Sequence, residues 1–449
     1  MRLPTKDEAR SMLSLAAPIA GLQLGLMFFG VVDMMFLGRL GPDALAGVGV
    51  GNAVYFGLFI AGLGAMLGID TLASRAWGAG QPGVCAGVFI HALALAAAVA
   101  GLLFAAIHLA GPFYALVGVE RSVAATALSF LGILKYMLFP GIYFVACRQY
   151  LQAMSVTRPL MWAIGLGNLV NALLNWLLIF GHGGFPALGV RGSALSSLTA
   201  TCFMLAVVGT AAAARVRAAR WRFHGWHRPV FAELVALGVP AGLQTMVEVC
   251  AFAFTTLLMG RLGPVVTSGH QIVLNMASVT FMVPLGISMA AAVRVGQGLG
   301  RGDRPGAARA GDAALSLGLV FMGAMAVVLW AAPAFLVRLY TADAGVTAVA
   351  LPLVLIAAVF QVFDGAQVVL TGALRGVGET RLPLLANLAG HWLVGIPLGA
   401  LLALRLGWGP RGLWLGLLSG LIVTAGLLAW AWRLCSAPLR YGAPAEFHT

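Results

Sequence analysis

Residues 88–110 read VFIHALALAAAVAGLLFAAIHLA, a continuous run without a single aspartate, glutamate, lysine or arginine. About 20 mainly apolar residues in a helix cross the bilayer core of about 30 Å, because in lipid only a helix satisfies its own backbone hydrogen bonds. The whole chain agrees, since 61% of its 449 residues are hydrophobic and 9% are charged, against about 25% charged in soluble proteins. The run therefore predicts a membrane-spanning helix. A spanning β-barrel would show alternating segments of about ten residues instead.

Breaks at proline, glycine and charged residues divide the chain into twelve apolar segments of this kind. In the first half they are 11–37, 44–73, 84–110, 122–150, 158–180 and 190–214, and in the second half 232–259, 265–296, 308–332, 346–374, 382–405 and 412–434. The first is too long and too rich in glycine for a cleaved signal peptide, so we expect it to be a helix of the protein. The five cysteines stand singly, without CxxC spacing, and indicate neither a disulfide framework nor a zinc site. The predicted fold class is an all-α integral membrane protein.

The longest polar interruption is RVRAARWRFHGWHR at 215–228, with five arginines and no acid. The positive-inside rule places this stretch in the cytoplasm. Six segments precede it and six follow it, so we expect both termini on the cytoplasmic side of the inner membrane. Alternating loops then put most of the 27 lysines and arginines on that side, which supports the count of helices. We interpret the net charge of +13 as a topology signal and not as nucleic-acid binding, since the basic residues form no single face.

The second half of the chain repeats the first at an offset of 222 residues. Pro18 falls on Pro240, and GRLG at 38–41 falls on GRLG at 260–263. Both prolines also interrupt helical hydrogen bonding, so we expect helix bends at these positions.

This repeat predicts two homologous six-helix lobes. We expect the first lobe at 1–214, a basic cytoplasmic linker at 215–231, and the second lobe with a short tail at 232–449. Six helices in each copy give the copies the same orientation, related by an axis along the membrane normal. Two such lobes that rock around a central substrate site form a common transporter design.

Three acidic residues lie in the middle of predicted helices: Asp33, Glu248 and Asp364. A charge at the bilayer centre costs at least about 2.5 kcal/mol and by default indicates function. The alternative is that the carboxyl groups are held in interhelical hydrogen bonds. None is repeated in the other half, since Asp33 falls on Thr255 and Asp364 falls near Gly141, so symmetric packing does not require them. Such carboxyls could take up and release a proton, or a pair of them could hold Na⁺ with amide and backbone oxygens. Either ion would couple transport to a gradient.

Asn168, Asn171 and Asn175 follow one another at spacings of three and four, so they share one face of the helix at 158–180. They either join helices together, or Asn171 and Asn175 line the Asp33 site. The spacing alone favours neither interpretation.

Aromatic and methionine side chains near the acids would suit flat apolar cations through stacking and cation–π contact, although most such residues only pack helices. The substrate-cavity candidates are Phe28, Phe252, Phe281, Met282, Phe360 and Phe363. His270 and His391 also lie in apolar segments, where single histidines are more often structural than ligands.

Enzyme motifs are absent from the sequence. It contains no GxxxxGK[ST] loop, so it is not a P-loop ATPase, and it contains neither GxSxG nor HExxH. A membrane prenyl transferase would need clustered aspartates of the DDxxD kind, which are also missing. We therefore expect neither enzymatic activity nor a resident cofactor. A lipid-linked glycan flippase of related architecture stays an alternative, but its cavity would be strongly cationic, whereas the intramembrane charges here are mainly acidic.

Three stretches in order resemble the multidrug and toxic compound extrusion (MATE) family, in its bacterial NorM-like branch. They are VDMMFLGRLGPDALAGVGVGN at 32–52, HQIVLNMASVTFMVPLGISMAAAVRVGQGLGRGD at 270–303 and TGALRGVGETRLPLLANLAGHWLVGIPLG at 371–399. The resemblance covers essentially the whole chain. It implies twelve helices in two lobes that open as a V, and export of organic cations and drugs, hence antibiotic resistance, against inward Na⁺ or H⁺. We expect a monomer whose partners are drug-like cations and the lipid bilayer, without an ATPase subunit.

The resemblance also implies roles for single residues. Asp33 matches the acid of the family's first helix, and Asn171 and Asn175 match its polar partners, although some members have Asp at the latter position. Ser197 stands where threonine is commoner, which puts its part in that site in doubt.

A second set of matches lies in the other half of the chain. Glu248 and Asp364 match a carboxylate pair tied to cation binding, so Na⁺ is a candidate ligand there. Phe281 and Met282 stand near the position where some members have tyrosine, which leaves the choice of ion open.

Overall fold

The computed structural model describes residues 5–220 and 225–441 of the chain. In these residues it has twelve helical spans long and apolar enough to cross a membrane. Each of the twelve predicted segments lies within one of these spans or overlaps it almost completely, and the predicted all-α membrane fold is confirmed. Residues 221–224 of the predicted linker lie outside the described residues.

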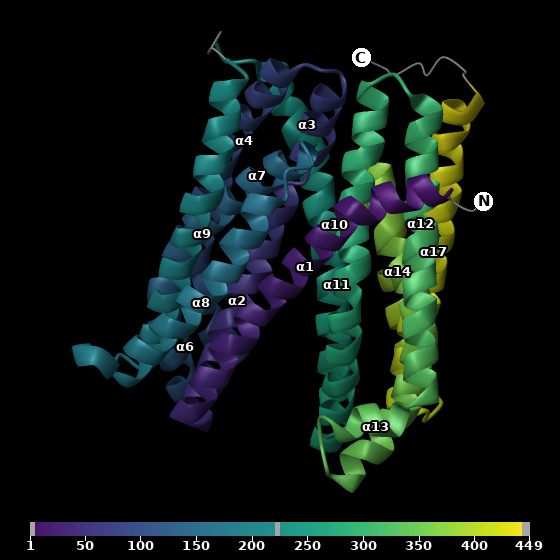
Figure 1. The fold of residues 1–449 in the computed structure, drawn as a ribbon. Helices are drawn as coiled ribbons and strands as arrows, with labels where there is room; N and C mark the ends of the chain where they lie inside the picture. The colour runs from purple at the N-terminus through teal and green to yellow at the C-terminus, as the bar shows by residue number, and fades with distance from the viewer. Residues whose placement is uncertain (1–4, 221–224, 442–449) are drawn as a thin grey trace. The chain divides into compact units, whose positions relative to one another are not determined.

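The first of two compact units comprises residues 21–242. It contains α2 (Pro42–Ala65), α3 (Gly68–Gly78), α4 (Pro82–Ala106), α5 (Ala110–Val117), α6 (Arg121–Leu134), α7 (Leu138–Ala153), α8 (Arg158–Phe180) and α9 (Val190–Ala218), with the second part of α1 (Lys6–Leu37) and the first part of α10 (Arg228–Gly260). Neighbouring pairs such as α8 and α9, α2 and α6, and α4 and α7 pack along their lengths (Figure 1). Their facing apolar side chains form one large core.

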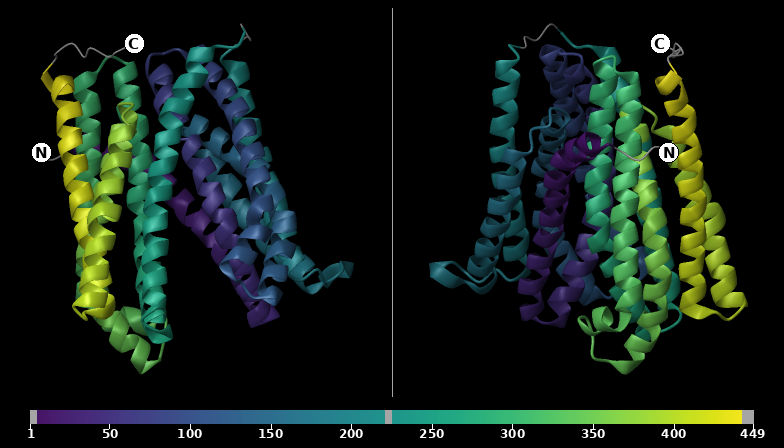
Figure 2. Two further views of the ribbon diagram at one scale, coloured as in Figure 1. Left: turned by 180° about the vertical axis from the view of Figure 1, so that it is seen from behind. Right: turned by 45° about the vertical axis from the view of Figure 1, so that its right-hand side comes forward.

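The second unit comprises the residues up to Ala20 and those from Leu243 onward. It contains α11 (Pro264–Gly300), α12 (Arg304–Ala331), α13 (Pro333–Arg338), α14 (Ala344–Gly376), α15 (Arg381–Asn387), α16 (Ile396–Ala400) and α17 (Gly409–Tyr441), with the remaining parts of α1 and α10. Helices α11, α12, α14 and α17 lie side by side (Figures 1 and 2). Between α15 and α16 the chain winds as a π-helix at Leu388–Gly395.

The start of α1 packs in the second unit, which differs from the predicted lobe boundaries at 1–214 and 232–449. Met12 and Ile19 are fully buried in an apolar cluster of that unit. Glu8 and Arg309 form an ion pair with 3.0 Å between Oε1 and Nε. In the reverse direction, Leu234 at the start of α10 belongs to the core of the first unit. The units differ from the expected lobes because buried contacts define them, whereas the prediction used the position of the loop.

The start of α1 packs in the second unit and the start of α10 packs in the first. Equivalent close contacts hold these two segments. A Cβ added to Gly64 of α2 would lie 2.1 Å from the Cα of Gly242 in α10. A Cβ added to Gly286 of α11 would lie 2.6 Å from the Cα of Ala20 in α1. The two pairs are related by the same offset of 222 residues that relates Pro18 to Pro240. The internal repeat therefore extends from the sequence to backbone packing.

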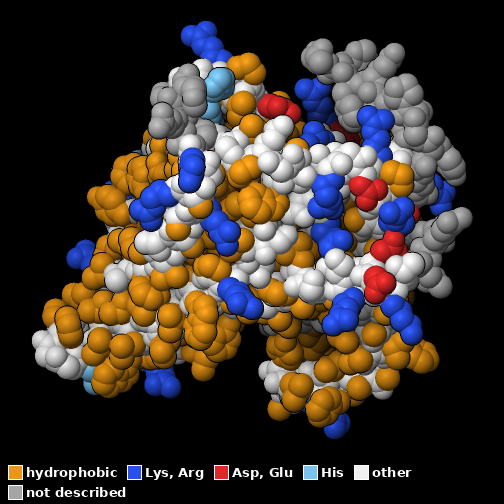
Figure 3. All heavy atoms as spheres, turned by 45° about the horizontal axis from the view of Figure 1, so that its top comes forward, with side chains coloured by type: hydrophobic (Ala, Val, Ile, Leu, Met, Phe, Trp, Pro, Cys, Tyr) orange, Lys and Arg blue, Asp and Glu red, His pale blue; other side chains and the backbone are white. Residues whose placement is uncertain are grey.

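The surface agrees with a membrane environment. In Figure 3, hydrophobic side chains cover much of the visible flanks, and lysine and arginine side chains are scattered between them. Large apolar side chains such as Leu102, Leu116 and Trp330 are mostly exposed, at 70%, 85% and 70%. Apolar exposure on this scale is what lipid-facing helices require.

Candidate functional site

In the first unit, one carboxylate collects three hydrogen bonds from two other helices. Asp33 lies near the end of α1, and its Oδ1 accepts from the amide nitrogens of Asn171 at 2.9 Å and Asn175 at 2.6 Å. Its Oδ2 accepts from the hydroxyl of Ser197 at 2.7 Å. The structure thus brings together all four residues that the resemblance grouped, Ser197 included.

The helical repeat explains how these donors converge. Asn171 and Asn175 are one turn apart on α8, so both amides face α1, and Asn175 Nδ2 also donates to Asn171 Oδ1 at 3.2 Å. Both asparagines are fully buried, and Ser197 on α9 is 3% exposed. Asn168 is not part of this group, because its Nδ2 donates to the carbonyls of Gly25 and Ile164. An ionised carboxylate only accepts hydrogen bonds, so three donors suit it well.

In the second unit, two carboxylates and a set of glutamines lie on α10 and α14. Glu248 accepts from Gln244 Nε2 at 3.2 Å. Asp364 is 5% exposed, close enough to Glu248 for their charges to interact, and its Oδ1 has no hydrogen-bond partner among the described residues. Gln367 lies beside Glu248. The predicted pair is therefore brought together, with amide groups around it.

Further polar groups extend this second site along α14. Gln361 is fully buried and accepts from the hydroxyl of Thr280 at 2.9 Å. The described residues contain no group of three or more histidine, cysteine, aspartate or glutamate side chains that could hold a metal ion. A cation at Glu248 and Asp364 would thus take its remaining ligands from amide and backbone oxygens, which hard cations accept readily.

The glutamines were not singled out from the sequence. A signal was present, because Gln361, Asp364 and Gln367 recur every three residues on α14 and so lie on neighbouring positions of one helix. Gln244 likewise precedes Glu248 by one turn. A neutral amide costs less to bury than a carboxylate, so a glutamine in an apolar helix is a weaker sign of function than an acid.

The two histidines in apolar segments have different surroundings. His270 Nδ1 accepts from Trp414 Nε1 at 3.2 Å, and its Nε2 lies 3.0 Å from the hydroxyl of Thr256, so both ring nitrogens are partnered. His391 Nδ1 lies 3.3 Å from the carbonyl of Asn387, whereas its buried Nε2 has no partner among the described residues. The geometry of His270 matches the structural role expected for it.

The predicted substrate-cavity residues are divided between the two units. Phe28 belongs to the first unit and is 55% exposed. Of the others, Phe252, Phe281, Met282 and Phe363 are partly buried. Phe360 is 1% exposed, and its ring packs against those of Phe252 and Trp414. The side chain of Phe360 thus belongs to the core of the second unit, and its predicted place in a substrate cavity stays a prediction.

Pro18 and Pro240 lie inside helices that continue past them. The boundary between the two units falls directly after each proline, at Ala20 in α1 and at Gly242 in α10. The prolines thus mark where each helix passes from one unit to the other, and the predicted bends stay a prediction.

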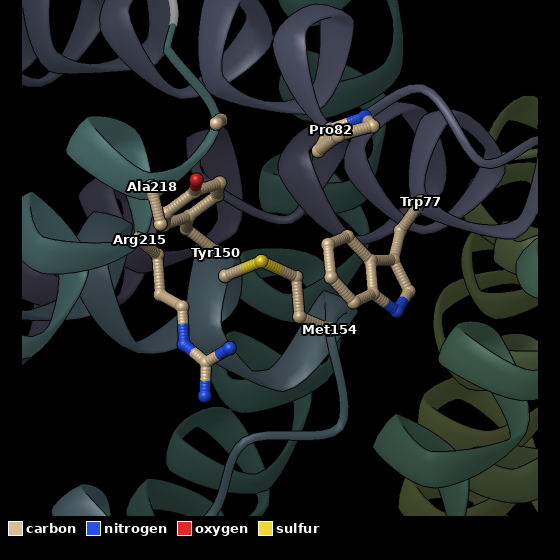
Figure 4. A pocket seen from close by; sticks show the side chains of 7 residues that line it. Trp77, Pro82, Tyr150, Met154, Arg215 and Ala218 are labelled. Carbon is tan, nitrogen blue, oxygen red and sulfur yellow. The ribbon is translucent and has the colours of Figure 1, made fainter.

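A separate pocket of about 140 Å³ lies in the first unit. It is lined by Trp77, Pro82, Tyr150, Met154, Arg215, Ala218 and Ala219. In Figure 4 the thioether of Met154 lies between Tyr150 and Trp77, and Arg215 lies to one side. None of the acids described above lines this pocket.

Comparison with known proteins gives consistent results over the full length. The chain is 38% identical over 444 residues to the "Multidrug resistance protein NorM" of Burkholderia vietnamiensis, covering 95% of this chain and 94% of that protein. It is 34% identical to the "Probable multidrug resistance protein NorM" of Mesorhizobium japonicum, covering 97% of both.

Solved structures share the fold. The eukaryotic MATE transporter AtDTX14 matches with a TM-score of 0.87 at 23% identity, over 97% of this chain and 98% of that one. A MOP superfamily transporter from Pyrococcus furiosus matches with a TM-score of 0.88 at 17% identity, over 98% and 100%. The MatE family model matches residues 18–177 and 240–401. The two matched segments begin at Pro18 and Pro240, the first residues of the repeat identified above. The chain therefore belongs to the MatE family.

Proposed function

We propose that this protein is a secondary active multidrug exporter, which moves amphiphilic organic cations out of the cell against inward Na⁺ or H⁺. Family membership and relatives named as multidrug resistance proteins support transport of drugs. The observation that carries the ion coupling is the presence of two acidic sites, one in each unit, within spans that cross the membrane.

The two sites offer different chemistry to an ion. All three partners of Asp33 direct N–H or O–H donors at its oxygens, so these side chains present donors to the carboxylate and not oxygen ligands to a metal ion. Glu248 and Asp364 instead provide two carboxylates next to glutamine side chains. Oxygen-rich sets of that kind suit Na⁺, a hard cation. We therefore assign H⁺ to Asp33 and Na⁺ to the pair.

Coupling requires the ion to bind the inward-facing and outward-facing states differently. Neutralising a buried carboxylate removes a charge whose solvation differs between those states, so ion binding shifts their populations. By linkage, the drug must shift ion binding by the same factor. We propose that the chain works in this way as a monomer in the inner membrane, with both termini in the cytoplasm and without an ATPase subunit or enzymatic step.

The test measures efflux of a fluorescent organic cation from proteoliposomes with Na⁺ and H⁺ gradients imposed separately. We expect at least one gradient to drive efflux. Asp364→Asn should abolish that efflux and drug resistance in cells while leaving expression intact. The matched control is Asp303→Asn, because Asp303 caps α12 through a bond to Gly306 N and asparagine caps a helix equally well.

Two results would overturn the proposal. Absence of efflux under either gradient would exclude ion-coupled antiport. Normal efflux by Asp364→Asn would remove this carboxylate from the coupling mechanism.

A further inference from the structure

A second group of buried polar residues lies in the first unit, apart from the Asp33 site. Arg148, Gln149 and Gln152 follow one another on α7 and are 1%, 0% and 1% exposed. Arg148 Nη1 donates to Gln23 Oε1 on α1 at 3.2 Å, and Gln149 Nε2 donates to Asp70 Oδ2 on α3 at 3.3 Å. Three helices thus contribute polar groups to one interior region.

Much of the hydrogen-bonding capacity of this region is unused. Arg148 Nε and Nη2, Gln149 Oε1 and both amide atoms of Gln152 have no partner among the described residues. Buried polar atoms of folded proteins are nearly always satisfied, and internal water does this where several donors and acceptors converge. The combination of unpartnered donors and acceptors within two turns of α7 is therefore the pattern of a hydrated interior.

The positive charge of Arg148 does not exclude a proton from this region, because it is compensated. The carboxylate of Asp70 interacts electrostatically with the Arg148 guanidinium. The opposite charges of Asp70 and Arg148 therefore offset each other in this region. A lone buried guanidinium would repel a hydrated proton, whereas a compensated one orients water.

A line of polar groups connects this region to Asp33. Two residues after Gln23 on α1, the Gly25 carbonyl accepts from Asn168 Nδ2 at 3.1 Å. Asn168 Oδ1 has no partner among the described residues. One turn further along α8, Asn171 donates to Asp33. A backbone carbonyl of α1 and the asparagine side chains of α8 therefore lie between the Arg148 region and the Asp33 site along these two helices.

The far end of the line lies at one membrane face. Gln152 is next to the last residue of α7, Ala153. The span that ends there and the span that ends with α9 are the fourth and sixth, so both end on the same side. That side carries the basic stretch at 215–228, which we expect in the cytoplasm. Asp33 lies near the C-terminal end of α1. This is the end of the first span, on the side of the membrane opposite to the ends of the fourth and sixth spans.

We propose that Gln23, Asp70, Arg148, Gln149 and Gln152 hold a chain of internal water that carries protons from Asp33 to the cytoplasm. The inference rests on the proposed ion-coupled function and specifies the exit route of one ion. The carboxylic acid of Asp33 gives its proton to a neighbouring water molecule and becomes the carboxylate that Asn171, Asn175 and Ser197 bind. Each later transfer breaks one O–H bond and forms another, so no further reactant is consumed.

The test compares drug efflux by variants of the residues that hold the proposed water chain, each reconstituted in proteoliposomes. Gln152→Leu and Gln23→Leu replace a polar side chain by an apolar one of similar size, whereas Gln152→Glu keeps polarity at the same length. We expect both leucine variants to lower efflux driven by a pH gradient about tenfold, the factor that about 1.4 kcal/mol of added barrier produces. Gln152→Glu should stay within about twofold of the parent, a difference of about 0.4 kcal/mol.

A structural role would give a different set of results. Drug-for-drug exchange at equal pH on both sides needs no net proton movement, so the leucine variants should keep the parental exchange rate and drug affinity. The control is Ser74→Ala on α3, since Ser74 is fully buried and, among the residues that the structure describes, its hydroxyl donates to the Thr71 carbonyl of its own helix alone. Equal loss of exchange and of proton-driven efflux would overturn the proposal, as would unchanged proton-driven efflux in both leucine variants. If the parent responds to Na⁺ alone, the proton route is wrong while the proposed antiport stands.

Discussion

At the scale of single residues, burial and hydrogen bonding separate structural polar groups from those open to an ion. His270 accepts a hydrogen bond at one ring nitrogen and has a hydroxyl partner at the other, so both ring nitrogens are satisfied. Asp364, in the same unit, keeps an unpartnered carboxylate oxygen. Both residues stood out in the sequence as polar groups in apolar helices, but only the structure shows which one has unused capacity.

We predict that Thr256→Val destabilises the second unit without changing the mechanism. The hydroxyl of Thr256 is the partner of His270 Nε2 at 3.0 Å, and its loss leaves a buried nitrogen unsatisfied. The expected cost is about 1–3 kcal/mol in the free energy of unfolding. Thermal unfolding of the detergent-solubilised protein measures it as a lower Tm, and transport per folded molecule should persist.

Thr255→Val is the matched control for this substitution. Within the described part of the chain, the hydroxyl of Thr255 donates to the Ala251 carbonyl of its own helix alone, so its removal should change Tm little. Equal Tm values for the two variants would show that the His270 contact contributes nothing. Loss of transport by Thr256→Val at unchanged Tm would make His270 a functional group.

At the scale of elements, the positions of the spans were predictable and their interruptions were not. The segment predicted at 44–73 is two helices in the structure, because α2 ends at Ala65 and α3 begins at Gly68. At this break α10 comes so close that a Cβ on Gly238 would lie 2.2 Å from the Ala65 carbonyl oxygen. A contact between residues so far apart in sequence has no local pattern, whereas the length of an apolar run is local.

The π-helix at Leu388–Gly395 also lies where a helix distant in sequence packs closely against the chain. Gly390 and Gly395 lie against the backbone of α17 around Gly420, so the winding follows from packing on another helix. The apolar run at 382–405 predicted its span, but nothing in that run distinguishes a π-helix from an α-helix.

We predict that Gly64→Leu strongly destabilises the first unit, because its Cβ would overlap Gly242 of α10. Overpacking of this kind costs about 1–3 kcal/mol or more in the free energy of unfolding. The repeat predicts the same for Gly286→Leu in the second unit, where Ala20 is the neighbour. Thermal unfolding again provides the measurement.

Gly57→Ala on the same helix α2 is the control, since a Cβ there meets no atom within 4 Å. It should be neutral or raise stability by up to about 1 kcal/mol, because alanine favours a helix. Wild-type stability of Gly64→Leu would mean that α2 and α10 separate without cost, contrary to the packing described above.

At the scale of the whole molecule, the scaffold is duplicated and the acidic chemistry is not. Pro18 and Pro240, and the two close helix contacts, repeat at one offset. Asp33, however, falls on Thr255, and the carboxylate pair has no counterpart in the first unit. The duplication and the unpaired acids were visible in the sequence. The exchange of the helix ends between the units was not, because it depends on which buried surfaces meet and not on where the loops fall.

The separation of the two acidic sites leads to a prediction about binding as opposed to transport. Na⁺ that binds the folded protein at Glu248 and Asp364 should raise its stability, by about 2.7 kcal/mol at a concentration a hundredfold above Kd. Because Asp33 belongs to the other unit, Asp33→Asn should keep the Na⁺-dependent rise in Tm, and Asp364→Asn should lose it. The proposed coupling uses both sites in one cycle, so each single variant should stop efflux and the double variant should lose no more than either, which is the non-additivity expected of groups that act together. Measuring Tm in NaCl against an equal concentration of choline chloride separates ion binding from ionic strength. A Na⁺ response lost in Asp33→Asn would show that the two units share one ion site, and additive losses of efflux would show that they drive transport independently.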